Sequence, residues 1–450
     1  MEKVNQFFDF EIKNKLFDIV DSNGLRPWEA VRFDVMMSVL HKPGDYVDLG
    51  KKQNVCKKIW KTVLSFIAFF VYLLRHRNTN TLFFLCSRDN NDGVQYDKIA
   101  DSLYTLIPKD SCFTIESMDI LNQKHNYKYG FDVAPNVANV FGLFSGVSKN
   151  IQVFYNLVLN EFPQSTITTE AMNQAYKYFV GQYYFYKMIF KLTKIKRAFL
   201  VQNDIQRGMF AAANELGVKM FELQHGQISF NHPAYSYPQE SVLSSDKIYH
   251  PDYLLIFGPF WSKNRSYPGV TDLVLGNNFY AERDVMPNTA ANKKLLVIAN
   301  NIEGKILSER VVEVLERRPD FTFIFKLHPN QYNEYNLYVR KFERYKQVEV
   351  VSDQRSINQL LSECEGIFLN QSTVELEALH KGRKVFVIKE QRYLSMDFVL
   401  GENGVYACSD VDDFLNKYEE HKNEVLEPRN DLFAKFDTLL AKQILEGYGS

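Results

Sequence analysis

The segment Lys326-Leu-His-Pro329 places a cation and an imidazole two positions apart at the end of an apolar run. That run, residues 321–325, is aromatic and β-branched, which is typical of a buried parallel strand. Open α/β sheets bind ligands at the carboxyl ends of their strands, so both side chains are expected at a binding edge. Lys326 and His328 have the chemistry to offset the charge of a phosphate, and Pro329 stiffens their loop. The alternative is a surface lysine beside a histidine that caps a strand end.

A second polar turn, Asn370-Gln-Ser-Thr-Val-Glu375, follows another apolar strand in the same half of the chain. Ser372 and Glu375 have the spacing of a capping box, which satisfies the free amides of a helix start. The same geometry favours a phosphate site at Ser372 and Thr373, with Glu375 placed to accept hydrogen bonds from a ribose. Asn370 is a further candidate. The two interpretations are compatible, because Ser372 can cap the helix while Thr373 faces a ligand.

A third polar turn, Gln224-His225-Gly226, closes a strand in the first half of the chain. Gly226 permits a tight turn and a close approach of the backbone to a ligand, and Gln224 is a further candidate. Asp204 ends the preceding strand, so the two loops are expected to be neighbours. An Asp or a His at this edge can deprotonate a hydroxyl that attacks an activated donor. Asp204 and His225 are therefore the candidate catalytic residues, unless His225 only caps its loop.

Strand and helix patterns that alternate along the chain must position these residues. In the first half, strands are expected at 81–87, 196–201, 219–223 and 252–257, with helices at 96–106 and 207–216. After a polar linker at 280–292, strands are expected at 295–299, 321–327, 348–351, 366–369 and 384–388. The alternation predicts an α/β protein with two Rossmann-like domains facing a central cleft. We expect domains at 1–285 and 286–430, followed by a C-terminal helix within 431–450 that packs back on the first domain.

Composition limits the classes of function. The 450 residues are 46% hydrophobic and 24% charged, as in a globular protein, and the net charge of −1 provides no field for nucleic acid. The sequence has no G-x-G-x-x-G, no Walker A and no H-E-x-x-H motif, so chemistry without a bound metal or cofactor is expected. Five scattered cysteines without a C-x-x-C pair favour the reducing cytoplasm.

One apolar segment, Thr62–Leu74, has 13 residues and is shorter than the roughly 20 that span a bilayer. It is bordered by basic residues, namely Lys57, Lys58, Lys61, Arg75 and Arg77. Two interpretations stay open: a buried core helix, or a helix that rests on an anionic membrane surface. An aromatic and basic stretch at 176–197 supports the second one. A peripheral contact with the inner membrane surface is thus a further expectation for a cytoplasmic protein.

These motifs together resemble the bacterial GT-B glycosyltransferases that build capsule and lipopolysaccharide. Residues 368–388 are similar to the donor-site strand, helix and strand of that fold. Lys326-Leu-His-Pro329 resembles the His-Pro motif of sialyltransferases, Kdo transferases and glycerophosphotransferases, in which the histidine contacts the donor's phosphate. Leu223-Gln-His-Gly226 resembles the Gln-His-Gly of capsule-assembly enzymes. The resemblance covers residues 293–390 firmly and the first half more loosely.

The resemblance implies metal-independent transfer of a sugar from a CMP-, CDP- or UDP-linked donor to a growing capsule or lipopolysaccharide glycan. The C-terminal domain would bind this nucleotide-sugar, and the N-terminal domain the glycan or glycolipid acceptor. The acidic Asp/Glu-Asp/Glu-Gly motif of sialyltransferases has no clean counterpart, which leaves the nucleotide base open. Two other functions also stay open, a nucleotide-sugar 2-epimerase of the same fold and a non-catalytic GT-B scaffold.

Overall fold

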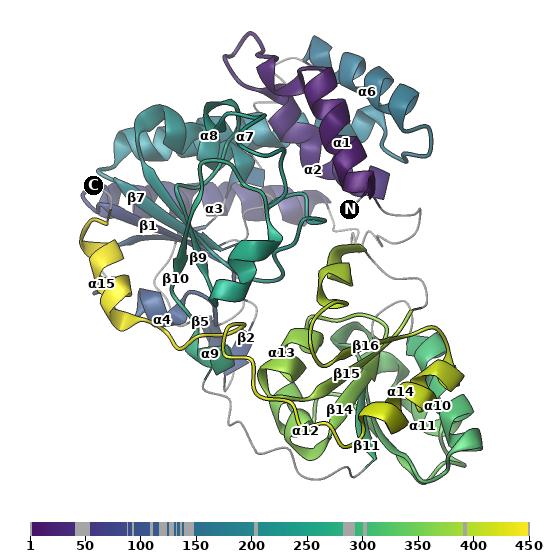
Figure 1. Ribbon diagram of the computed structural model, residues 1–450. Helices are drawn as coiled ribbons and strands as arrows, with labels where there is room; N and C mark the ends of the chain where they lie inside the picture. The colour runs from purple at the N-terminus through teal and green to yellow at the C-terminus, as the bar shows by residue number, and fades with distance from the viewer. Residues whose placement is uncertain are drawn as a thin grey trace. The chain divides into compact units, whose positions relative to one another are not determined.

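The chain divides into two compact units in the computed structural model (Figure 1). Unit 1 consists of Met1–Phe257, Trp261–Asn277 and Phe436–Ser450, and unit 2 of Gly258–Phe260 and Asn278–Lys435. The structure describes residues 2–40, 55–87, 89–91, 94–108, 111–116, 124–125, 130–131, 133–135, 137–138, 148–201, 206–281, 293–299, 304–389 and 394–448. Most of the predicted linker, residues 282–292, lies outside them.

Unit 1 is built on a sheet of seven strands in the order β10-β9-β8-β7-β1-β4-β6, and every pairing along it is parallel. In chain order, β1, β4 and β6 extend the sheet toward one edge, and β7, β8, β9 and β10 then extend it from β1 toward the opposite edge. The central strands β1 and β7 are buried on both faces, which explains their continuous apolar sequences. The strands are β1 Thr81–Leu85, β4 Phe113–Glu116, β6 Gly130–Phe131, β7 Arg197–Val201, β8 Lys219–Leu223, β9 Tyr253–Ile256 and β10 Thr271–Val274.

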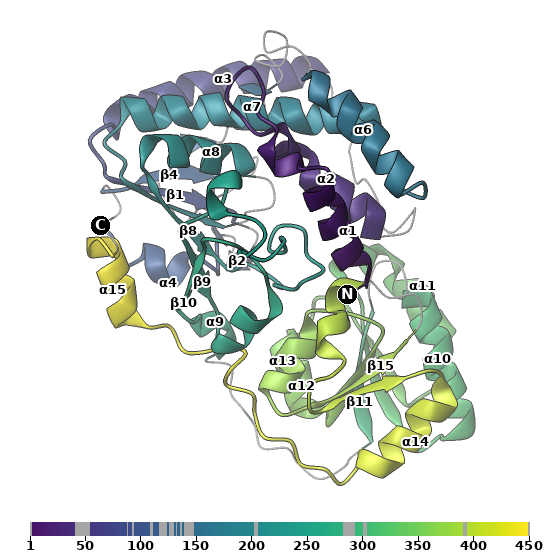
Figure 2. The same cartoon turned by 45° about the horizontal axis from the view of Figure 1, so that its top comes forward.

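The helices of unit 1 pack on this sheet and on one another. α7 (Thr169–Leu192) runs beside α8 (Arg207–Leu216) (Figure 1). Gly208 allows their close approach, since an added Cβ would lie 2.4 Å from the Phe179 carbonyl oxygen. α3 (Val55–Arg75) lies alongside α7 (Figure 2). Further helices are α1 Glu2–Lys13, α2 Pro27–Leu40, α4 Asp101–Tyr104 and α6 Lys149–Glu161.

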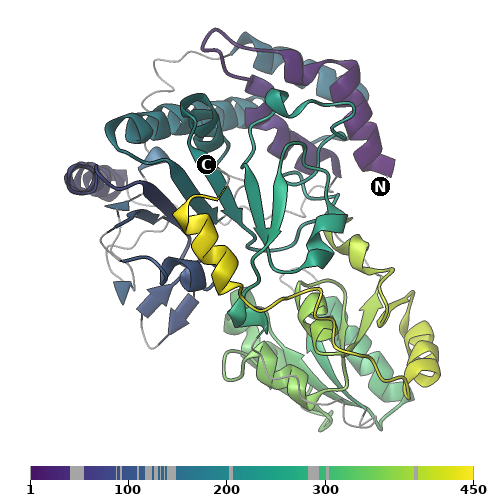
Figure 3. The ribbon, with the colours of Figure 1, turned by 60° about the vertical axis from the view of Figure 1, so that its left-hand side comes forward.

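The C-terminal segment also belongs to unit 1. α15 (Thr438–Glu446) lies across the sheet, as the yellow helix in Figure 3 shows. The guanidinium of Arg197 donates to the carbonyl oxygen of Ile444 at 3.2 Å. The helix begins later than the pattern of apolar residues in this region suggests, because Asp437 caps it by accepting a hydrogen bond from the amide of Leu440 at 2.9 Å.

Unit 2 is built on a sheet of six parallel strands in the order β13-β12-β11-β14-β15-β16. Helices flank both faces, with α12 and α13 on one and α10, α11 and α14 on the other (Figure 2). The strands are β11 Lys294–Ile298, β12 Thr322–Lys326, β13 Val348–Val351, β14 Gly366–Leu369, β15 Lys384–Ile388 and β16 Val405–Cys408. The helices are α10 Gly304–Arg317, α11 Tyr335–Lys341, α12 Ile357–Glu363, α13 Val374–His380 and α14 Val411–His421. Each of the two units is therefore Rossmann-like, as predicted for an α/β protein of this class.

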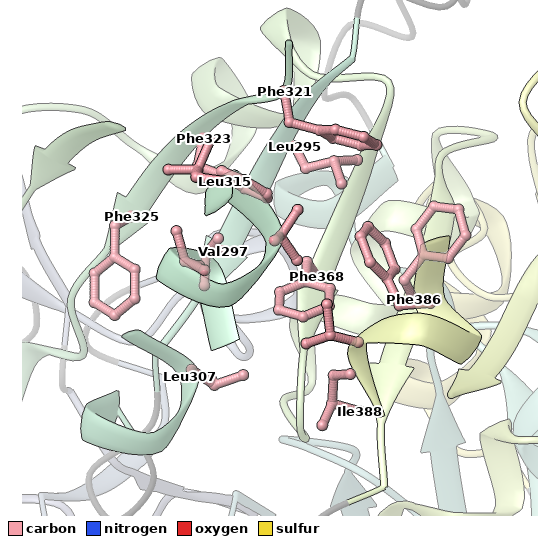
Figure 4. Close-up of a cluster of buried hydrophobic side chains, with 14 of the residues drawn as sticks. Leu295, Val297, Leu307, Leu315, Phe321, Phe323, Phe325, Phe368, Phe386 and Ile388 are labelled. Atoms are coloured by element: carbon pink, nitrogen blue, oxygen red, sulfur yellow. The ribbon is translucent and has the colours of Figure 1, made fainter. Parts of the chain in front are cut away.

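An aromatic core fills the space between this sheet and α10, α11 and α14 (Figure 4). Phe323 and Phe325 project from β12 and Phe368 from β14, the two strands that flank β11. The rings of Phe368 and Phe414 meet edge to face with centroids 4.8 Å apart. Such pairs add to the stabilisation that burial alone gives. The core thus fixes β12 and β14, the two strands that end in the predicted donor motifs.

Two structural findings differ from or extend the sequence pattern. The predicted helix at 96–106 is reduced to α4, because Val94–Tyr96 forms a strand, β3, and Asp97 caps the turn that follows. None of the helices in the described part of the chain has the length and apolar character that crossing a bilayer requires.

Candidate functional site

Each sheet has a point where the strand order reverses, and such points are where doubly wound folds bind ligands. In unit 2 it lies between β11 and β14, and in unit 1 between β1 and β7. Ile298, the last residue of β11, pairs with Lys326 of β12 on one side and with Leu369 of β14 on the other. Because neighbouring strands lie about 4.8 Å apart, the two predicted donor motifs begin about 10 Å from each other at one edge.

Lys326 is the last residue of β12 and its side chain is buried. Its ammonium lies 3.4 Å from the hydroxyl of Tyr332 and 5.3 Å from the centre of that ring. Burial lowers the pKa of Lys326, an effect that the nearby Asp353 opposes and Arg355 reinforces. An ammonium that has lost much of its hydration gains strongly from an anionic partner. Lys326 therefore has the environment of a phosphate-binding cation.

His328 is half-buried and caps the short 3₁₀ helix Pro329–Glu334. Its Nδ1 accepts a hydrogen bond from the amide of Asn330 at 3.2 Å, so the neutral ring must carry its proton on Nε2. Burial lowers the pKa of His328, which favours this neutral form at pH 7. Both interpretations of His328 therefore fit the structure. Its Nδ1 caps the loop, and the resulting tautomer leaves Nε2–H as a hydrogen-bond donor for a ligand.

The turn after β14 forms half of the predicted capping box. The carboxylate of Glu375 accepts from the amide of Ser372 at 3.0 Å, but Ser372 Oγ accepts from the amide of Val374 at 3.3 Å rather than from that of Glu375. Glu375 is fully buried and Thr373 is exposed. Ribose binding by Glu375 therefore stays a prediction, and its evident role here is to hold the turn.

Asn370 lies at the reversal point itself, directly after β14. Its side-chain amide donates to the carbonyl oxygen of Ile388, the last residue of β15, at 3.1 Å. Its buried Oδ1 has no hydrogen-bond partner among the described residues. A buried acceptor without a partner is costly, so this atom is suited to a donor group of a ligand.

At the corresponding edge of unit 1, Gln224 organises the turn that carries His225. Its Oε1 accepts from the amide of Phe257 at 2.8 Å, and its Nε2 donates to the carbonyl oxygen of Gly226 at 2.9 Å. His225 is half-exposed beyond this buried clamp. Gly226 does not have a positive φ, and an added Cβ would meet nothing within 4 Å, so the turn itself does not require a glycine. Asp204 lies outside the described residues.

Sequence reasoning missed one titratable residue at this edge, Glu116, the last residue of β4. Its carboxylate accepts from both the amide and the hydroxyl of Ser87, each at 2.9 Å, and Ser87 lies two residues after the end of β1. Burial, with help from the charge of Asp97, raises the pKa of Glu116 to about 7 against the opposing bonds from Ser87. A carboxyl that titrates near neutrality can exchange protons at physiological pH. An acid that ends an apolar strand was the available signal.

The acidic side chains of the described part of the chain form no cluster of three or more metal-binding groups. The sequence Asp410-Val-Asp412 has the D-x-D spacing, but Asp410 caps α14 by accepting from the amide of Asp413 at 2.8 Å. Asp412 is an exposed partner of Arg317 at 3.7 Å. This acidic pair therefore serves a helix start.

The site segment of unit 2 matches a known family. Residues 303–394 fit the family model described as "Capsule polysaccharide biosynthesis protein", which confirms the resemblance for the part that carries both donor motifs. No curated protein sequence matches the chain.

Solved structures with a similar course of the chain are of low sequence identity. UDP-GlcNAc 2-epimerase from Neisseria meningitidis bound to UDP-GlcNAc shares 13% identity over 82% of this chain and 99% of that chain, with a TM-score of 0.47. UDP-GlcNAc 2-epimerase from Methanocaldococcus jannaschii shares 13% identity over 82% of this chain and 100% of that chain, with a TM-score of 0.46. The lipopolysaccharide outer core galactosyltransferase WaaB in its apo form shares 12% identity over 81% of this chain and 98% of that chain, with a TM-score of 0.43. Because these scores are below 0.5, the assignment of the fold rests on the strand orders above.

Proposed function

We propose that the chain is a glycosyltransferase that moves a sugar from a nucleotide-activated donor to a bacterial capsule or lipopolysaccharide glycan. One observation carries the proposal. The segment that matches the capsule family contains β12 and β14, the two strands that flank β11 beside the reversal point of unit 2. The ends of these strands bring Lys326, His328 and Asn370 to one sheet edge. That edge has a desolvated cation, a fixed imidazole donor and a buried acceptor.

The proposed reaction assigns a role to each group. The bond between the sugar's anomeric carbon and the donor phosphate breaks, and a bond to the acceptor oxygen forms. Lys326 and the Nε2–H of His328 offset the charge that develops on the departing nucleotide phosphate, with Ser372 and Thr373 beside them. The proton of the acceptor hydroxyl passes to a base of unit 1, for which Asp204 and His225 are the proposed candidates. The scheme uses no metal.

Nucleotide binding is the first test. Thermal unfolding is followed with CMP, CDP, UDP and GDP, since a ligand at about 100 times its Kd stabilises the native state by about 2.7 kcal/mol. We expect one nucleotide to raise the Tm, and Lys326→Ala and His328→Ala to weaken its binding. Lys346→Ala is the matched control, because this exposed lysine precedes β13 at the opposite edge of the same sheet. Equal binding by all three variants would refute the donor site.

Transfer is tested with the sugar form of the nucleotide that binds, with and without capsule or lipopolysaccharide glycan, and with EDTA present. We expect sugar on the glycan and released nucleotide only when the acceptor is added, and lower turnover in Asp204→Asn or His225→Ala. Epimerised nucleotide-sugar without acceptor would replace the transferase by a 2-epimerase. Binding without either reaction would favour a scaffold.

A further inference from the structure

Helix α3 has one face that anchors it to unit 1. Phe69 and Leu73 are buried, and the ring of Phe69 packs against Phe185 of α7 with centroids 5.1 Å apart. Tyr72 stacks edge to face on Phe113 of β4 at 5.1 Å, and its hydroxyl accepts from the amide of Thr114 at 3.0 Å. These contacts fix the rotation of the helix about its axis.

The other face of α3 is apolar and exposed. The exposed fractions are 44% for Val63, 59% for Ile67, 40% for Phe70, 44% for Val71 and 66% for Leu74. At 3.6 residues per turn these positions fall within an arc of about 100°, along about 17 Å of helix. We call these five residues the α3 stripe. A continuous apolar surface of this kind marks an interaction site rather than chance exposure.

Cations border the C-terminal end of the stripe. Arg75 and Arg77 follow it directly, and the amide of Lys194, just beyond α7, donates to the carbonyl oxygen of Arg77 at 3.0 Å. That bond brings the exposed Lys194 and Lys196 beside the end of α3. The rim thus gathers four exposed cations from two chain segments next to one apolar face.

We propose that the α3 stripe docks on an anionic lipid bilayer surface, with its apolar side chains at the level of the acyl boundary and the cationic rim on the headgroups. An apolar face binds such an interface through buried area, and adjacent Lys and Arg add attraction to acidic headgroups. The charge of the rim selects the lipid surface over other occupants. The proposal is independent of the proposed sugar transfer, because it concerns only where unit 1 binds.

Vesicle sedimentation tests the docking. The full chain is mixed with vesicles of phosphatidylglycerol and phosphatidylcholine, or of phosphatidylcholine alone, at about 0.1 M and about 0.5 M salt. We expect binding to the anionic vesicles, weakened by the higher salt, and little binding to the neutral ones. Ile67→Glu with Leu74→Glu should lower the affinity about 10-fold or more, because charged side chains resist insertion. Arg75→Gln with Arg77→Gln should remove most of the salt dependence.

A matched control carries the same change elsewhere. Leu337→Glu with Leu439→Glu alters two leucines of other helices whose exposed fractions, 63% and 69%, are close to those of Ile67 and Leu74. This variant should bind vesicles like the wild type. Circular dichroism and Tm show that each variant is folded, which the exposure of the substituted residues favours.

Three outcomes would overturn the proposal. In the first, the wild type does not bind anionic vesicles. In the second, Ile67→Glu with Leu74→Glu binds them as well as Leu337→Glu with Leu439→Glu does. In the third, ultracentrifugation shows a dimer that Ile67→Glu with Leu74→Glu converts to a monomer without a change in vesicle binding. The stripe would then be an interface between two copies of the chain.

Discussion

The buried carboxyl of Glu116 makes the stability of unit 1 depend on pH in a direction that can be worked out. Its side chain is 1% exposed, and burial raises its pKa from an ordinary 4.5 to about 7. Below about pH 4.5 the carboxyl is protonated in the folded and the unfolded state, and its stabilising effect is complete. Between pH 4.5 and about pH 7 the carboxyl of Glu116 is ionised in the unfolded chain but still protonated in the folded one. The free energy of unfolding therefore falls as pH rises through this range, and it falls no further above about pH 7.

The magnitude follows from the two values. The difference between about 7 and 4.5, at about 1.36 kcal/mol per pH unit, corresponds to about 3 kcal/mol. Glu116→Gln keeps a neutral group of the same shape, whose amide and carbonyl can still bond with the amide and hydroxyl of Ser87. The free energy of unfolding of Glu116→Gln minus that of the wild type should therefore rise by about 3 kcal/mol from about pH 4 to about pH 8.

Urea unfolding followed by tryptophan fluorescence measures this difference. Trp28, Trp60 and Trp261 all belong to unit 1, so the signal reports the unit that contains Glu116. Glu240→Gln is the control, because this glutamate is exposed in the same unit. A difference between variant and wild type that stays constant within about 0.5 kcal/mol across the pH range would show that burial does not hold the proton on Glu116, and the reasoning would be refuted.

Two further predictions concern the proposed site. His328→Ala should lose one hydrogen bond to a charged phosphate, which is about 1.5–3 kcal/mol, and so weaken nucleotide binding about 10-fold or more. His328→Gln should retain most of the affinity, because its side-chain amide can replace the Nε2–H donor. Calorimetry measures both affinities. Gln224→Met removes, at nearly constant volume, the bond from Phe257 after β9 and the bond to Gly226 within the turn. It should cost about 1–3 kcal/mol of stability and lower turnover while nucleotide affinity stays unchanged. A parallel fall in nucleotide affinity would mean that Gln224 serves the donor site instead.

The sequence predicted unit 2 well because its strands follow one simple rule. Val348–Val351, Gly366–Leu369 and Lys384–Ile388 have the bounds expected from short apolar runs between turn residues. A strand buried on both faces needs such a short apolar run, and few other kinds of local structure need one. The positions of Lys326 and Asn370 at one edge then follow from the strand order, because both flank β11.

The features that sequence did not predict depend on distant partners. Leu432 and Phe433 extend the apolar pattern before α15, yet they pack outside any helix, since the cap at Asp437 sets the helix start. The raised pKa of Glu116 depends on Ser87, 29 residues away, and no local pattern records that proximity. The two faces of Thr62–Leu74 are distinguished by the contacts of Phe69 and Tyr72 with Phe113 of β4, which no local pattern records.

The route of the chain has a consequence for its synthesis. Unit 1 is closed by residues that follow the whole of unit 2, through the bond from the amide of Asp437 to the carbonyl oxygen of Leu275 at 2.8 Å and through α15 on Arg197. Domains fold in the order in which a ribosome completes them. Unit 2 can therefore finish first, although unit 1 begins first, and the sheet of unit 1 must wait partly uncovered until its last helix emerges. A chaperone that shields this sheet would act over that interval.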